Sequence, residues 1–171
     1  MGLSVAPETA SMPRLEPSPL ARALGRIPSG VYVVSTLHAD TAVAFVGSFV
    51  QQVAFEPPTL VLAVAHDRMQ LPDLRKTGRF ALSILGAGDQ ALMSPFMKRA
   101  ATGLAPFDGL AVGLTASGLT VLESALAWLD CRISDERAAG DHTVLFGIVE
   151  EARVLREGEP RVHLRKSGLA Y

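Results

Sequence analysis

Residues 41–65 read TAVAFVGSFVQQVAFEPPTLVLAVA and form the most hydrophobic stretch of the chain. Two glutamines, a glutamate and two prolines interrupt the stretch, so it does not have the composition of a membrane-spanning helix. Its β-branched and aromatic residues, broken by Glu56-Pro57-Pro58, are typical of strands separated by a turn. We therefore expect consecutive buried strands at residues 42–49, 52–55 and 59–64. The last is an unbroken apolar run, which predicts burial on both faces.

The same alternation of apolar segments and turns continues on both sides of this stretch. Further strands are expected at residues 31–36, 79–85, 125–133, 143–155 and 161–164, with a turn at 38–40 and a loop over 94–118. Short helices are expected at residues 19–27, 67–77 and 88–93, from capping residues and apolar spacing. Many strands with few short helices predict a mainly-β barrel.

The length of 171 residues fits one domain. Residues 1–19 hold four prolines and no long apolar run, so they predict a flexible tail rather than a secretory signal, and residues 20–171 the folded domain. A net charge of −1 gives no electrostatic reason to expect nucleic acid or an anionic membrane as a partner. With 49% hydrophobic and 19% charged residues, the composition favours a buried subunit interface.

Cys131 is the only cysteine. An intrachain disulfide is therefore impossible, no metal-ligand spacing exists and no metal site is predicted. A reducing compartment fits, and we expect the cytoplasm. Because Cys131 lies in an apolar run, a buried structural thiol is favoured over a nucleophile. The chain also lacks a GxGxxG motif, a phosphate-binding loop and a Ser/His/Asp spacing.

Polar residues interrupt the apolar strands within residues 46–58, and they are Gly47, Ser48, Gln51 and Gln52. Buried polar groups need hydrogen-bond partners. The partner is either the protein itself, through turns and bulges, or a ligand with both apolar and hydrogen-bonding edges. Spacing alone leaves both interpretations open.

Two further segments carry candidate chemistry. His142 follows a charged loop, Gly140-Asp141, and starts a strand. It is either a surface or capping residue, or a group whose near-neutral pKa serves proton exchange near a redox centre. Residues 162–171, VHLRKSGLAY, either fray as a polar tail or pack through their strand-like start and aromatic end.

The chain resembles the flavin reductase-like, FMN-binding split-barrel family from about Leu20 to Tyr171. The order and spacing of five segments carry the resemblance, namely residues 30–36, 48–58, 78–85, 122–131 and 140–147. Within this family, QQVAFEPP and VHLRKSGLAY look most like the flavin reductase module of flavodiiron proteins.

This resemblance implies a split β-barrel with a few short helices, which binds FMN, or FAD as the alternative, near the interface of a homodimer. The positions expected to line the flavin are Val46, Gly47, Ser48, Gln51, Gln52, Ser83, Ile84 and Leu85. His142 is the candidate catalytic residue on the nicotinamide side. Threonine is usual in the family where Val46 stands, and asparagine is frequent where Ser83 stands. Loss of one neutral hydrogen bond weakens flavin binding by about threefold to tenfold, which would suit an exchangeable flavin.

The function that the resemblance implies is hydride transfer from NADH or NADPH to flavin, with reduced flavin passing to a partner monooxygenase or another acceptor. A flavoprotein that keeps FMN bound and reduces a different acceptor is one alternative. A non-catalytic flavin- or haem-binding protein on the same barrel is another.

Overall fold

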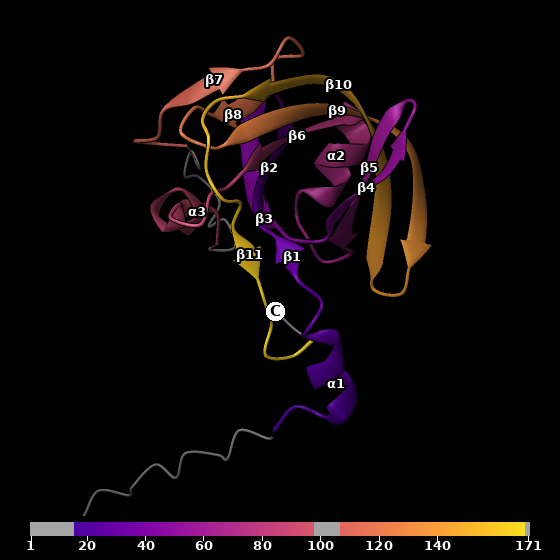
Figure 1. The fold of residues 1–171 in the computed structure, drawn as a ribbon. Helices are drawn as coiled ribbons and strands as arrows, with labels where there is room; N and C mark the ends of the chain where they lie inside the picture. Colours follow the sequence, from indigo (N-terminus) through magenta and orange to yellow (C-terminus); the bar gives the residue numbers. More distant parts are fainter. Residues whose placement is uncertain (1–15, 98–106, 170–171) are drawn as a thin grey trace, which may run out of the picture. The chain divides into compact units, whose positions relative to one another are not determined.

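Seven antiparallel strands form the main sheet in the computed structural model of the chain, which describes residues 16–97 and 107–169 (Figure 1). Their order across the sheet is β3-β2-β6-β9-β10-β5-β4. The bounds in chain order are β2 Tyr32–His38, β3 Thr41–Gly47, β4 Val50–Phe55, β5 Pro58–Ala65, β6 Arg79–Ile84, β9 Ala127–Ala139 and β10 His142–Val154. The outermost strands, β3 and β4, are consecutive in the chain, so one short connection joins the two edges of the sheet.

Two small two-stranded sheets and three short helices complete the described fold. The small sheets pair β1 Ser29–Gly30 with β11 Val162–His163, and β7 Val112–Leu114 with β8 Thr120–Leu122. The helices are α1 Pro19–Leu24, α2 Leu71–Thr77 and α3 Gln90–Met97. This confirms the predicted mainly-β architecture. In the described part of the chain, no helix is long and apolar enough to cross a membrane.

Two-residue turns join three pairs of neighbouring strands. Ala39-Asp40 connects β2 to β3 with φ angles of 44° and 66°, the left-handed conformation at both positions that tight hairpins require. Glu56-Pro57 connects β4 to β5, and Gly140-Asp141 connects β9 to β10. The predicted turn at 38–40, the break at 56–58 and the run of consecutive strands over residues 41–65 are confirmed.

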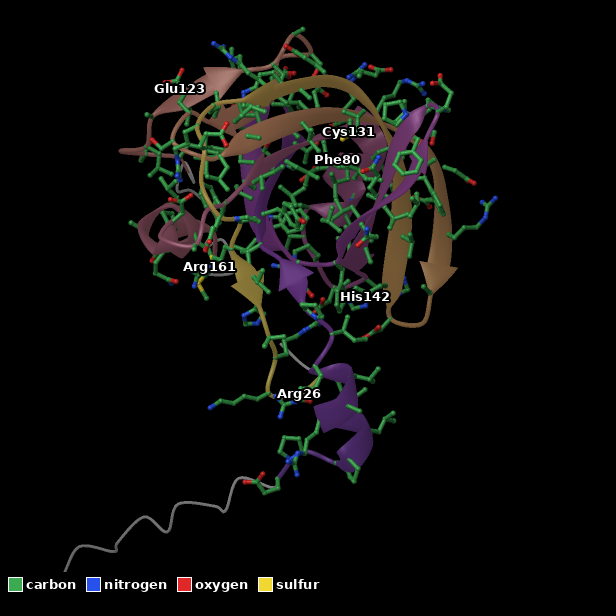
Figure 2. The ribbon with its side chains drawn as sticks, viewed as in Figure 1. Arg26, Phe80, Glu123, Cys131, His142 and Arg161 are labelled. Carbon is green, nitrogen blue, oxygen red and sulfur yellow. The ribbon has the colours of Figure 1, made fainter. Side chains whose placement is uncertain are left out.

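The main core lies against the sheet and is closed by α2, which contributes Leu71 and Leu74. Gly78 ends α2 in the left-handed conformation, with φ 66°, as its position predicts. Phe80 and Cys131 lie in the same core and are fully buried (Figure 2). Burial raises the pKa of the Cys131 thiol to about 12, so it stays protonated, and its predicted burial is confirmed.

A second core forms beside α3, where Met93 and Phe96 pack with Val33 and Ala44. The helix starts directly after Asp89, close to the predicted start, but it runs on to Met97. The prediction of a loop over residues 94–118 is therefore wrong where α3 and β7 lie within it, because burial of an apolar helix face and a short strand pairing override the local Gly and Pro content. Residues 98–106 of that segment lie outside the described residues.

Two of the predicted strands, β5 and β9, differ from the expectation in burial or length. Burial along β5 alternates, with Leu60, Leu62 and Val64 buried and the residues between them partly exposed. The expectation of burial on both faces is therefore wrong, because β5 is next to the outermost strand and only one of its faces meets the core. Strand β9 runs on to Ala139, well beyond its predicted end at residue 133, and carries exposed residues at the turn end of the β9–β10 hairpin.

The chain divides into two compact units, Pro28–His163 and a smaller unit that combines Met1–Ile27 with Leu164–Tyr171. In the smaller unit, the Ser18 hydroxyl caps α1 by accepting a hydrogen bond from the Ala21 N–H at 3.2 Å. The predicted flexible tail, residues 1–19, falls mostly on residues 1–15, which lie outside the described residues, while Pro19 is the first residue of α1.

The carboxyl-terminal segment packs against α1. The Gly168 N–H donates to the Ala21 carbonyl at 2.7 Å, and the Arg165 N–H donates to the Gly25 carbonyl at 3.2 Å. Of the two interpretations of residues 162–171, packing therefore holds for residues 162–169, since β11 pairs with β1. Residues 170–171 lie outside the described part.

Candidate functional site

Strand β2 lies between two of the predicted flavin-binding segments. Val33 pairs with Val46 of β3 on one side and with Ser83 of β6 on the other. At about 4.8 Å per strand, Val46 and Ser83 are about 10 Å apart on the same face. Ser83 is 2% exposed, and its Oγ accepts a hydrogen bond from the Leu122 N–H at 3.0 Å. Its hydroxyl therefore already has a protein partner, which ties β8 to β6.

The next row across the sheet holds Gly47 and Ile84, both paired with Tyr32. A Cβ on Gly47 would lie 2.8 Å from Val34 Cγ2, so only glycine fits without a shift of the core. Gly47 can contact a ligand only through its backbone. Leu85, which follows β6, is fully buried in the core beside α3. The structure thus gives Gly47 and Leu85 packing roles, and their predicted contact with flavin remains a prediction.

Ser48 lies in the connection between β3 and β4 and is partly exposed. Within residues 16–97 and 107–169, no hydrogen bond engages its hydroxyl, in contrast to that of Ser83. A partly exposed hydroxyl on a short strand connection is available to a ligand. The contact of Ser48 with a ligand remains a prediction.

Gln51 and Gln52 are exposed on β4. Each carboxamide donates to a nearby backbone carbonyl of the same strand, Gln51 to the Gln52 carbonyl at 3.3 Å and Gln52 to the Ala54 carbonyl at 3.2 Å. A register shift between Gln52 and Ala54 leaves Val53 as a β-bulge. Because consecutive side chains leave a strand on opposite faces, a ligand on one face of β4 reaches only one of these two glutamines.

His142 begins β10 at the turn end of the long hairpin (Figure 2). Its Nδ1 lies 2.7 Å from Asp141 Oδ1, and its side chain is 15% exposed. An ionised carboxylate only accepts hydrogen bonds, so Nδ1 is the donor in this contact. The hydrogen bond from His142, followed by the charge of that ring, holds the pKa of Asp141 below its ordinary value.

The Phe49 ring joins the two candidate segments. It meets the His142 ring edge to face, with centroids 5.6 Å apart and an interplanar angle of 61°. The Phe49 carbonyl accepts a hydrogen bond from the Ala63 N–H at 2.9 Å, which fixes the connection onto β5. Ser48 is therefore the immediate neighbour of a residue that touches His142, although 93 positions separate Phe49 from His142 in the chain.

Sequence reasoning did not select Phe49 as a site residue. An aromatic residue inside an apolar stretch indicates a core position, and no periodicity identifies its partner across the sheet. The register of β5 against β10, which pairs Ala65 with His142, decides that contact. His66 lies at the same place, since its N–H donates to the Asp141 carbonyl at 2.9 Å.

The donor set at the β3–β4 connection fits a flavin. An isoalloxazine ring needs an apolar wall together with hydrogen-bonding groups at its edge. Val46 and Phe49 are partly exposed apolar residues, Ser48 offers a hydroxyl, and an exposed glutamine carboxamide follows on β4. The residues present are compatible with flavin by this chemistry.

A family model described as a flavin reductase like domain matches residues 24–168. The chain belongs to the flavin reductase-like family. Diflavin flavoprotein A 1 of Synechocystis sp. is 36% identical over 90% of the chain and 27% of its own length. The chain thus spans about a quarter of the length of the curated relatives it matches.

Solved structures of similar chains agree with the family. NADH:FAD oxidoreductase of Streptomyces globisporus superposes with a TM-score of 0.78 and 28% identity, covering 86% of both chains, and has also been solved with NAD and FAD fragments. Nitrilotriacetate monooxygenase component B of Mycobacterium thermoresistibile gives a TM-score of 0.78 and 25% identity over 85% of this chain and 80% of its own. The predicted family and split-barrel fold are confirmed.

Proposed function

We propose that this protein is an NAD(P)H-dependent flavin reductase whose site lies where the β3–β4 connection meets the start of β10. One observation carries the proposal: the Phe49 ring, next to Ser48 in the β3–β4 connection, contacts the His142 ring, which Asp141 orients. The family match supports the proposed reaction class, and this contact supports the proposed location of the site.

The flavin, when bound, provides the electron acceptor for the hydride of a reduced nicotinamide. Ser48 would donate a hydrogen bond to it, and Val46 with Phe49 would form its apolar wall. His142 would orient the nicotinamide or exchange a proton near it, with its ring held by Asp141 through Nδ1. The partial burial of the His142 ring limits its access to water. Few acid–base side chains are needed because the cofactors carry the chemistry and the protein positions them.

FMN is the proposed flavin, with FAD as the alternative, and either NADH or NADPH is the proposed electron donor. The absence of a hydroxyl at Val46 supports a flavin that exchanges rather than one that stays bound. The cytoplasm is the proposed compartment, because such a reductase works where reduced nicotinamides are supplied.

Steady-state oxidation of NADH and NADPH, followed at 340 nm with and without added FMN or FAD, tests the proposal. Oxidation that depends on added flavin is the expected result. A purified protein that oxidises neither nicotinamide above background, in the presence of either flavin, would contradict it. Oxidation without added flavin but with a separate acceptor would instead support a bound-FMN enzyme.

A partner oxygenase is the proposed acceptor of the reduced flavin, supported by a similar chain that is a component of a monooxygenase system. We also propose a homodimer that uses the β4 edge. β4 ends the seven-stranded sheet of the described residues and exposes Val53 at 51% and Phe55 at 88%. An exposed edge strand with apolar side chains is prone to pair with another chain, and a second copy is the partner always present.

A further inference from the structure

Basic residues line a cavity of about 640 Å³ in the smaller unit. Its walls come from α1, the residues on either side of that helix and the carboxyl-terminal segment, and its lining comprises Glu16, Pro17, Arg22, Arg26, Leu164, Arg165 and Lys166. Four cationic groups and one carboxylate give this lining a net charge of +3, although the whole chain carries −1. The cavity therefore concentrates positive charge far beyond the average of the chain.

The arginines of the larger unit are used differently. Five of them form ion pairs with carboxylates, namely Arg75, Arg79, Arg132, Arg137 and Arg156. In the described part of the chain, by contrast, no ion pair joins Arg22, Arg26 or Lys166 to a carboxylate. A cation near the C-terminus of a helix interacts favourably with the negative end of the helix dipole. That role explains Arg22, the basic residue in the last turn of α1, but does not require a cluster of four cations.

Backbone contacts hold the two walls of the cavity together. The Arg165 N–H donates to the Gly25 carbonyl at 3.2 Å, and a Cβ on Gly25 would lie 2.5 Å from the Arg165 carbonyl oxygen. A Cβ on Gly168 would lie 2.2 Å from Leu24 Cβ. Both glycines therefore permit a close approach that other residues would prevent. The backbone of both walls is thus held in place, and Arg26 follows Gly25, the C-cap residue of α1 (Figure 2).

We propose that this cavity binds the phosphate group of a small molecule. Guanidinium groups match phosphate oxygens in pairs of parallel hydrogen bonds, and a doubly charged anion gains most from several cations at once. The volume exceeds what a lone phosphate ion needs and lies within the range of small-molecule sites. Pro17 and Leu164 add apolar surface for the rest of such a ligand. The ligand is thus a phosphate ester such as a nucleoside monophosphate, or inorganic phosphate bound by the same groups.

Isothermal titration of the full chain at constant ionic strength tests this site, with inorganic phosphate, adenosine 5′-monophosphate and adenosine as ligands. The monophosphate is expected to bind, and adenosine is expected not to bind. If inorganic phosphate binds as well, the phosphate group alone is sufficient for binding. If only the monophosphate binds, the organic part of the ligand is also required. Equal binding of adenosine and its monophosphate would overturn the proposal, as would the absence of binding by both phosphate ligands.

Charge-neutralising variants locate the site. Arg22→Gln and Arg26→Gln are each expected to weaken binding about threefold, and the double variant about tenfold, because exposed charge pairs contribute modestly. Arg153→Gln, an exposed arginine on β10, is the matched control and should stay within about twofold. Unchanged affinity in the double variant, with an unchanged melting temperature, would place the phosphate elsewhere. Binding to anionic lipid vesicles or an acidic peptide in the absence of phosphate binding would also reject the proposal.

Discussion

Ser48 and Ser83 show how the same side chain takes opposite roles at nearby positions. The Ser83 hydroxyl accepts the Leu122 N–H and is buried, whereas the Ser48 hydroxyl is partly exposed and has no hydrogen bond within the described residues. Both are small polar residues near strand ends, so the sequence alone gives them similar weight. The structure separates a residue that holds the barrel together from one that can meet a ligand.

Ser48→Ala is expected to weaken flavin affinity about threefold to tenfold, because one neutral hydrogen bond to the ligand is lost. Fluorescence titration of FMN measures this change. Ser134→Ala is the matched control, since Ser134 is an exposed serine on β9 whose hydroxyl donates to the Phe146 carbonyl. An unchanged flavin dissociation constant in Ser48→Ala would remove Ser48 from the site.

His142→Ala is expected to raise KM for the nicotinamide about threefold to tenfold, with a smaller change in flavin affinity. The reason is the proposed position of the His142 ring beside the nicotinamide, with its Nδ1 bonded to Asp141. His38→Ala provides the control, because His38 forms a similar pair with Asp73 at 2.8 Å on the β2 end. Equal kinetics in both variants would show that the His142 pair serves only the turn.

Gly147 on β10 has no room for a side chain. A Cβ there would lie 2.6 Å from Phe80 Cζ, and Phe80 is fully buried. Gly147→Ala is therefore expected to lower the free energy of unfolding by about 1–3 kcal/mol through overpacking. Urea denaturation measures the change. A combined Gly147→Ala, Phe80→Leu variant should recover part of the loss, and a single variant as stable as the parent chain would contradict the close contact.

At the scale of elements, the hairpins follow from local chemistry more closely than the pairings between distant strands. The turns at 38–40 and 56–58, and the end of α2 at Gly78, were predicted because Pro restricts the backbone, while Gly and Asp tolerate the left-handed conformation of turns and helix ends. The Phe49–His142 contact was not predicted, because it depends on the register of β5 against β10. The β7–β8 pair was likewise missed, since three-residue strands carry too little pattern.

The β2–β3 hairpin places an alanine where the backbone is left-handed. Ala39 has φ 44°, a conformation that costs residues with a Cβ about 1–2 kcal/mol, and less for asparagine. Ala39→Asn is therefore expected to raise stability by about 0.5–1 kcal/mol, or about 2 °C in melting temperature. Ala39→Val should instead lower the stability and the melting temperature, because a β-branched side chain increases the backbone strain. Calorimetry on both variants checks the pair, and a shift in the same direction for both would contradict it.

At the scale of the whole molecule, the exposed apolar edge at β4 has the strongest consequence for assembly. Phe55→Lys is expected to convert the proposed dimer to a species of the 18.1 kDa chain mass, because it puts a charge on the edge strand. Light scattering after size exclusion measures the mass. Leu114→Lys, at an exposed leucine on β7, should leave the dimer intact. A parent chain that is already monomeric would remove the dimer proposal.

The hydrogen bond from the Gly168 N–H to the Ala21 carbonyl bears on how this fold could be joined to other domains. Within the smaller unit, α1 and the carboxyl-terminal segment are therefore in contact, as domain termini often are. A fold of this kind can be spliced into a host polypeptide with two short linkers and little distortion. The chain matches about a quarter of the length of its diflavin flavoprotein relatives, and such a junction is compatible with that arrangement.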